Sequence, residues 1–299
     1  MMELKRFDYT PILGWSMTRF NVFSICKRKY YYQYYAKYDP EFPRAMIDDL
    51  KELTTIPMES GAIAHDIIQV LLQRLAHTQD AVDTERLFEY ALDITQGRCR
   101  ARRFSEVYYH EREDVSLDDV FPRVQGSLEN LLASDRFQWF CDPTIQDYEN
   151  WLIEPPGFGE TRIKGMKAYC KVDFLLPEGE ELLIFDWKTG KQDADKHGAQ
   201  LIGYAAWASF HFEIDPQAIR PIIVYLFPDY GEMELRFDAE DVVEFEQRVR
   251  AEREEMFGFC QDVEKNIPKE KSVFPKTSNR RICEYCNFRE LCKIEPVSS

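Results

Sequence analysis

Apolar residues recur at helical spacing through most of the first half of the chain. Four stretches carry this pattern and are predicted to be helices, namely 16–38, 59–77, 84–104 and 120–133. Near residue 147 short apolar or alternating segments, bounded by turn residues, replace the helical pattern. We therefore predict a mainly helical first half and a strand-rich second half.

The second half has the element order of an α/β layer. Its predicted strands are 150–156, 167–176, 181–187 and 219–227, and a predicted helix, 195–212, separates the last two. Two strands, a helix and a strand, with helices on both sides, indicate a central mixed sheet flanked by helices. Turn residues gather only at short sites such as PPGFG (155–159), so we expect a compact body.

One predicted strand runs from apolar residues directly into charges, in the segment LLIFDWKTGKQ. Alternate residues of a strand share a face, so Asp186 and Lys188 are expected to point one way and Trp187 toward the core. Charges at strand ends are common, and the pair read alone is equally well explained as the polar rim of a hairpin.

A second carboxylate, Asp173, belongs to the preceding predicted strand. If Glu178 and Gly179 form a two-residue hairpin loop, Asp173 lies opposite Ile184, and Asp186 is its diagonal neighbour on the same face. An odd loop length would place the acids on opposite faces. Two converging carboxylates require a cation, and a divalent metal ion with oxygen ligands is the natural one.

Two helical pairs are candidates to join this site. Gly61 and His65 are four residues apart on one predicted helix face, although a lone histidine is more often a core or capping residue. Gln200 and Tyr204 have the same spacing and could hydrogen-bond a substrate phosphate. The alternative is that Tyr204 packs on the sheet while Gln200 stays solvated.

Three of the eight cysteines have metal-ligand spacing near the end of the sequence: Cys283, Cys286 and Cys292. Cys26 is the candidate for a fourth ligand and would join the two ends of the chain. Spacing alone leaves zinc and an iron–sulfur cluster open. The other cysteines adjoin apolar or helical sequence and are interpreted as small apolar residues: Cys99, Cys141, Cys170 and Cys260.

The formal net charge of −15 opposes nucleic-acid binding at long range, so such a partner would need a local basic surface or a metal ion. Two basic runs are candidates for phosphate contacts: Lys27 and Arg28, and the group Arg98, Arg100, Arg102 and Arg103. The first run is followed by tyrosines. This composition is typical either of a groove that binds single-stranded nucleic acid or of an apolar core. The second is equally typical of a solvated helix end. No apolar run is long enough to span a membrane, and we expect a cytoplasmic protein.

Taken in chain order, these motifs resemble the RecB-like branch of the PD-(D/E)XK nuclease superfamily, and most closely its iron–sulfur members. Those include CRISPR-associated RecB-like exonucleases and AddB-type nuclease domains. The motifs are Cys26, Gly61-x3-His65, Asp173, Asp186-x-Lys188, Gln200-x3-Tyr204 and the terminal cysteine triplet. The resemblance covers residues 17–78 and 147–292. Asp186 stands where many members have Glu, which keeps the ligand type.

The resemblance implies a restriction-endonuclease-like core with a role for each motif. His65, Asp173, Asp186 and the Trp187 backbone carbonyl would bind Mg²⁺ or Mn²⁺. Lys188 would orient the attacking water or offset charge on the phosphate, and Gln200 and Tyr204 would position the strand. Cys26, Cys283, Cys286 and Cys292 would carry a structural 4Fe-4S cluster, with zinc the less favoured occupant.

The expected function is a metal-dependent DNA exonuclease acting on single-stranded or frayed ends, in DNA repair or CRISPR adaptation. Two alternatives stay open: a nuclease subunit that works with a helicase or with CRISPR adaptation proteins, and a DNA-end-binding protein with a vestigial site. The expected parts are an N-terminal helical segment (1–79), a helical insertion (80–146), the nuclease core (147–259) and a cluster-binding segment (260–299).

Overall fold

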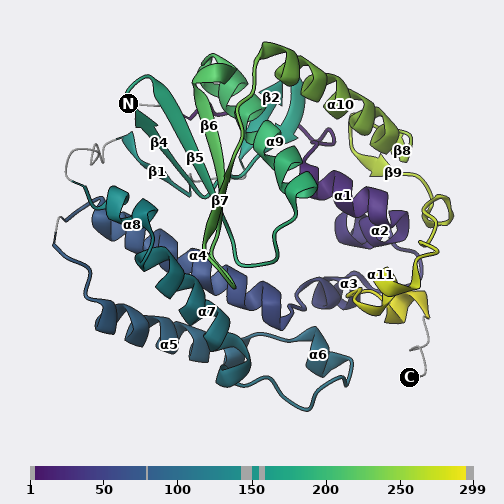
Figure 1. The fold of residues 1–299 in the computed structure, drawn as a ribbon. Coiled ribbons are helices and arrows are strands. Elements are labelled where there is room, and N and C mark those ends of the chain that lie inside the picture. The colour runs from purple at the N-terminus through teal and green to yellow at the C-terminus, as the bar shows by residue number, and fades with distance from the viewer. Residues whose placement is uncertain (1–3, 79, 143–149, 155–158, 294–299) are drawn as a thin grey trace.

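A five-stranded mixed sheet lies at the centre of the protein (Figure 1). The computed structural model describes residues 4–78, 80–142, 150–154 and 159–293. The sheet has the order β1-β4-β5-β6-β7, and only its β5–β6 pair is parallel. Its strands are β1 (Leu152–Ile153), β4 (Phe174–Glu178), β5 (Glu181–Lys188), β6 (Ile219–Tyr225) and β7 (Gly231–Glu234). The predicted mixed α/β fold is confirmed.

The sheet is covered by helices on both faces, because its side chains alternate between two apolar cores. Phe174, Phe185 and Trp187 belong to the core beneath helices α4, α5, α7 and α8. Ile184 and Ile223 point to the other face, where α9 packs. These helices are α4 (Ile56–Leu75), α5 (Thr84–Ala101), α7 (Leu117–Leu132), α8 (Asp135–Phe140) and α9 (Ala194–Phe212). The residues expected as an insertion thus share a core with the sheet.

The β4–β5 hairpin brings the two predicted acids together, through a turn shifted by one residue. Glu178 pairs with Glu181, so Gly179 and Glu180 form the loop, and Gly179 has a φ of 58° that glycine adopts without strain. Phe174 pairs with Phe185, and the next step places Asp173 opposite Asp186, not opposite Ile184 as expected. The shift changes the register by two residues, which preserves the shared face.

The stretch 167–176, expected as one strand, forms parts of two. β3 (Met166–Tyr169) pairs with β2 (Glu160–Ile163) in a separate sheet, whereas β4 begins at Phe174 in the main one. The backbone of Trp15 holds β3 from its other side, through bonds of 2.9 Å to the Lys167 carbonyl and 2.7 Å from the Tyr169 N–H. Asp173 therefore lies in a bend just before its strand. The turn expected at PPGFG falls mostly outside the described residues.

The predicted helix 16–38 is interrupted at Cys26, which separates α1 (Met17–Ile25) from α2 (Lys27–Tyr35). Cys26 is extended, with φ −160° and ψ 111°, and its Sγ accepts the Lys29 N–H at 3.4 Å as the cap of α2. The remaining helices and short strands are α3 (Arg44–Lys51), α6 (Ser105–Tyr108), α10 (Ala239–Phe257), α11 (Arg280–Glu284), β8 (Cys260–Asp262) and β9 (Ile267–Pro268).

The C-terminal segment returns to the N-terminal helices, so that α11 lies next to α2 and α3 (Figure 1). Arg28 donates to the Phe274 carbonyl at 2.9 Å, and the Asn287 amide donates to the Leu50 and Leu53 carbonyls at 3.1 and 2.9 Å. These contacts are part of a second core that α1, α2, α3 and α10 share with the C-terminal segment. Across the described residues, no helix is both long and apolar enough to cross a membrane.

Candidate active site

Asp186 is a buried carboxylate with protein partners on both oxygens; it is 4% exposed. Its Oδ1 accepts from the Tyr204 hydroxyl and, at 3.2 Å, from Gln200 Nε2. Its Oδ2 forms an ion pair with Lys188. Burial raises the pKa of Asp186, and the charge of Asp173 adds to this, while Lys188 opposes the shift only in part. A further positive charge beside this carboxylate, such as a metal ion, would therefore stabilise its ionised form.

Asp173 and His65 form the second part of the site. Asp173 Oδ2 accepts the Trp187 N–H at 2.9 Å and lies 3.4 Å from His65 Nδ1. Burial would raise the pKa of Asp173, but the hydrogen bond and charge of His65, together with the Trp187 N–H, lower it. Burial would likewise lower the pKa of His65, and Asp173 raises it instead. Helix α4 thus places His65 next to Asp173, beside the end of β5.

The close approach of α4 depends on Gly61, one turn before His65. A Cβ atom at this position would lie 2.8 Å from Thr189 Oγ1, which is closer than a Cβ atom normally approaches any heavy atom. Thr189 follows Lys188, so the space left by the glycine lets the helix pack against the charged end of β5.

Arg123, on α7, is a neighbour of this site that sequence reasoning missed. It donates to the Thr189 carbonyl at 2.9 Å, and its guanidinium lies 5.0 Å from the centre of the Phe227 ring. It fixes the backbone immediately after Lys188. A single arginine within a helix carries no local signal for such a role, since only the packing of α7 places it there.

Gln200 and Tyr204 project from one face of α9, as predicted, but toward Asp186 and not toward open solvent. Tyr204 is 4% exposed, and burial together with the charge of Asp186 raises its pKa well above the ordinary value. Its hydroxyl therefore stays a proton donor to the carboxylate. In this arrangement the pair orients a candidate metal ligand.

The donor set suits a hard divalent cation. His65, Asp173 and Asp186 provide one imidazole nitrogen and carboxylate oxygens, which Mn²⁺ and Mg²⁺ accept. As placed, no group of three or more His, Cys, Asp or Glu in the described part of the chain is arranged to hold an ion. Lys188 and His65 contact the carboxylate oxygens that a metal ion would use. The ligand role of the Trp187 carbonyl stays a prediction.

The four predicted cluster ligands line one small cavity of about 20 Å³, between α2 and the C-terminal segment. Those thiols belong to Cys26, Cys283, Cys286 and Cys292. Burial raises the pKa of the last three, to about 11 for Cys292. A cavity of this size holds roughly one water molecule, so the side chains would have to open around a larger group. The soft, four-thiol donor set fits zinc or an iron–sulfur centre in kind.

Most of the predicted phosphate-contacting residues have partners within the fold. Lys27 lies 3.3 Å from the centre of the Phe23 ring and pairs with Glu255 at 2.9 Å, and Arg28 binds the backbone carbonyls of Lys271 and Phe274. The adjoining tyrosines are core residues, which excludes them as a base-stacking surface: Tyr30, Tyr31 and Tyr32.

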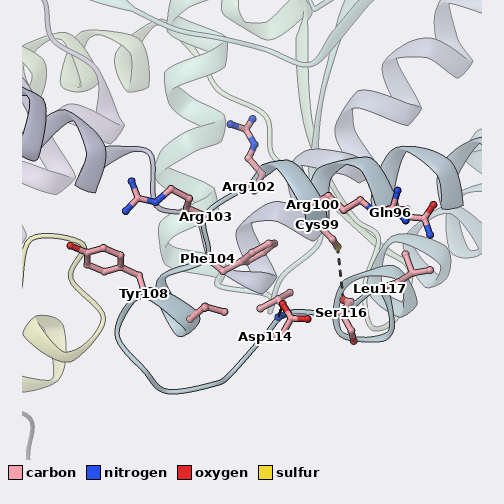
Figure 2. A pocket seen from close by; sticks show the side chains of 12 residues that line it. Gln96, Cys99, Arg100, Arg102, Arg103, Phe104, Tyr108, Asp114, Ser116 and Leu117 are labelled. Carbon is pink, nitrogen blue, oxygen red and sulfur yellow. Dashed lines mark hydrogen bonds between the residues drawn. The ribbon is translucent and has the colours of Figure 1, made fainter.

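The arginines of the second basic run differ in their surroundings: two pair with acidic residues, and two are exposed near a cavity. Arg98 pairs with the buried Glu59 at 3.2 Å and with Asp66, and Arg102 lies 3.5 Å from Glu59. Figure 2 shows Arg100 beside Gln96 at one end of a cavity of about 570 Å³, with Arg103 at the other end, near Tyr108. Arg100 and Arg103 are exposed and remain candidates for phosphate contacts.

One of three comparisons with known proteins identifies a family. The sequence matches the family described as the PD-(D/E)XK nuclease superfamily over residues 14–293. A solved structure described as "Crystal structure of SSO0001" is 16% identical, covers 71% of this chain and 96% of its own, and has a TM-score of 0.29. The search of curated proteins finds no match. The match over nearly the whole chain shows that this protein belongs to the PD-(D/E)XK nuclease superfamily, and hence to a class of hydrolases that cleave nucleic acids.

Proposed function

We propose that this protein is a metal-dependent nuclease that hydrolyses phosphodiester bonds in DNA. The observation that carries the proposal is the meeting of Asp173, Asp186 and Lys188 at the end of β5, with His65 delivered from α4. Family membership supports the same chemistry. Asp186 is a buried carboxylate with a raised pKa, Asp173 beside it is partly buried, and a divalent cation would stabilise both charges.

His65, Asp173 and Asp186 would hold Mg²⁺ or Mn²⁺, which supplies Lewis acidity toward the phosphate. Tyr204 and Gln200 keep the Asp186 carboxylate oriented and charged through their hydrogen bonds. Lys188, released from Asp186, would place its ammonium group where negative charge develops on the phosphate or hold the attacking water. Arg123 keeps the adjoining backbone fixed through the Thr189 carbonyl.

We further propose that the substrate is single-stranded DNA or DNA with free ends, degraded exonucleolytically in DNA repair or CRISPR adaptation. This finer assignment rests on the motif resemblance. Arg100 and Arg103 are the exposed arginines proposed to contact phosphates. A helicase or CRISPR adaptation proteins are the proposed partners.

The cysteine cavity is proposed to carry a structural 4Fe-4S cluster, with zinc as the alternative occupant. The support is that thiols from both ends of the chain line one cavity. Because an unmetallated thiol with a raised pKa stays protonated, binding would release protons and stabilise the contact between α2 and α11.

Digestion of end-labelled single and double strands in the presence of Mn²⁺ tests the proposed activity. We expect single strands to be shortened from an end by the wild-type protein, and left intact by folded Asp173→Ala and Asp186→Ala variants. Cleavage that persists in both variants, or that does not need a divalent ion, would refute the proposed site. Internal cleavage would refute only its exonucleolytic character.

A further inference from the structure

A cavity of about 220 Å³ lies next to the carboxylate site. Gln200 and Tyr204 line it, and both also donate to Asp186 Oδ1. These two side chains therefore connect the cavity to the proposed metal ligand. The proposed hydrolysis does not require this cavity.

Four of the fourteen described residues that line the cavity are aromatic. They are Trp15, Tyr169, Tyr204 and Trp207. Its volume is far above the roughly 10–15 Å³ that one water needs. It is below the roughly 300–1,000 Å³ of pockets for larger ligands. The size and the walls suit a single planar ring system.

The charge around the cavity favours a ligand attached to phosphate. The chain has 53 acidic and 38 basic residues, yet none of the described residues that line this cavity is acidic. Ser16, Met17 and Thr18 line it from the beginning of α1, where the helix presents partial positive charge. Lys171 also lines it, with a side chain that is 60% exposed and an ammonium group that pairs with Glu154 at 3.2 Å.

We propose that this cavity receives the base of the nucleotide next to the phosphate being cleaved. The inference rests on the proposed nuclease function and extends it to the substrate. A base inside a duplex is stacked on both sides and cannot enter such a cavity without leaving the stack. The site therefore selects single strands and frayed ends, and base stacking on its walls holds the strand in place.

Thr18 offers a way to block the cavity without touching the carboxylate site, because it is exposed and lines the opening. Thr18→Trp fills the opening, and Thr18→Ser is the matched control. Tyr169→Ala acts in the opposite way, by removing one aromatic wall, and serves where the tryptophan variant does not fold. Circular dichroism establishes the fold of each variant.

The experiment measures binding of fluorescent single-stranded oligonucleotides in EDTA, with one abasic residue moved along the strand. In the wild-type protein and Thr18→Ser, loss of the base at one position should weaken binding about fivefold or more, the usual size of one stacked base. Thr18→Trp and Tyr169→Ala should bind the intact strand about fivefold or more weakly than the wild-type protein does. In these two variants, removal of the base should cause no further loss of affinity.

The outcomes separate this inference from the proposed activity. A wild-type protein that cleaves DNA with Mn²⁺, yet shows no position-specific abasic penalty, overturns the base site alone. An unchanged penalty in folded Thr18→Trp and Tyr169→Ala does the same. A wild-type protein that neither binds nor cleaves DNA overturns both.

Discussion

At the scale of single residues, the site depends on how each charge is neutralised. Asp186 and Lys188 could be predicted from strand alternation, and Asp173 from the neighbouring hairpin. The hydrogen bonds from Tyr204 and Gln200 to Asp186 could not, because helical spacing shows that two residues share a face but not which group they meet. Arg123 was missed for a similar reason: only tertiary packing places it beside Thr189.

Tyr204→Phe should lower the cleavage rate, because it removes a hydrogen bond to the buried Asp186. We expect a loss of about 1–3 kcal/mol in the free energy of unfolding, the usual cost of leaving such a group without a partner. Tyr225→Phe is a matched control on the same core, since the Tyr225 hydroxyl lies 2.7 Å from His197 Nδ1 instead. Urea unfolding and initial cleavage rates should show both variants destabilised and only Tyr204→Phe slowed.

The affinity for Mn²⁺ should rise with pH through the raised pKa of His65. The proton on His65 competes with the metal ion, and Asp173 holds that proton to a pH above the ordinary value of 6.5. Without metal, His65 stabilises the fold fully below pH 6.5, and this contribution is lost as the pH rises through its folded-state pKa. Calorimetric titration across this range measures both affinity and proton release. Affinity that does not change with pH would contradict the ligand role, and His65→Gln should weaken the dependence, leaving the part that comes from the raised pKa of Asp186.

At the scale of elements, the sequence predicts the main helices and the β4–β5 hairpin, because their apolar periods are long or regular. It does not predict that 167–176 belongs to two sheets. That stretch contains no glycine or proline to mark a break, and the backbone of Trp15, which is far away in sequence, binds its first part. The sequence does not predict the break at Cys26 either, because the residues on both sides of it have the composition of a helix.

Two glycines in helices should respond in opposite ways to alanine. Gly61→Ala puts a Cβ atom 2.8 Å from Thr189 Oγ1, so α4 or the end of β5 must shift. We expect a loss of about 1–3 kcal/mol in the free energy of unfolding, together with slower cleavage. Gly97→Ala, on α5, meets no atom within 4 Å and should gain about 0.5–1 kcal/mol from helix propensity. Chemical unfolding of both variants measures the contrast, and equal changes would contradict this packing.

At the scale of the whole molecule, a three-layer body joins a second core in which the C-terminal segment packs against α1, α2 and α3. The layers could be predicted, because sheet residues alternate between two apolar faces. The approach of the C-terminal segment to Cys26 was predicted only from the cysteines, and the structure brings those four thiols to one cavity. Spacing cannot show how wide that cavity is or which group fills it.

Cys286→Ser should remove the bound metal and destabilise the contact between α2 and α11. We expect visible absorbance and stoichiometric iron in the wild-type protein, and a loss of both in the variant with a lower melting temperature. Cys99→Ser is the control, because Cys99 donates to the Ser116 carbonyl at 3.8 Å, and a serine hydroxyl can donate there as well. A colourless wild-type protein with stoichiometric zinc would replace the iron–sulfur assignment. A wild-type protein without bound metal would refute the proposal of a metal centre at these cysteines.

Asp173, Asp186 and Lys188 are proposed to form one metal-dependent hydrolytic site. The most direct test compares Lys188→Met with the wild-type protein in single-turnover cleavage of a labelled single strand, with Mn²⁺ binding measured on the same samples. We predict that the variant keeps its fold and binds Mn²⁺ at least as well, since the ion no longer competes with the ammonium group. Its cleavage rate should fall about 10²–10³-fold, the usual cost of losing one such donor. Cleavage at the wild-type rate by a folded Lys188→Met variant would contradict the account.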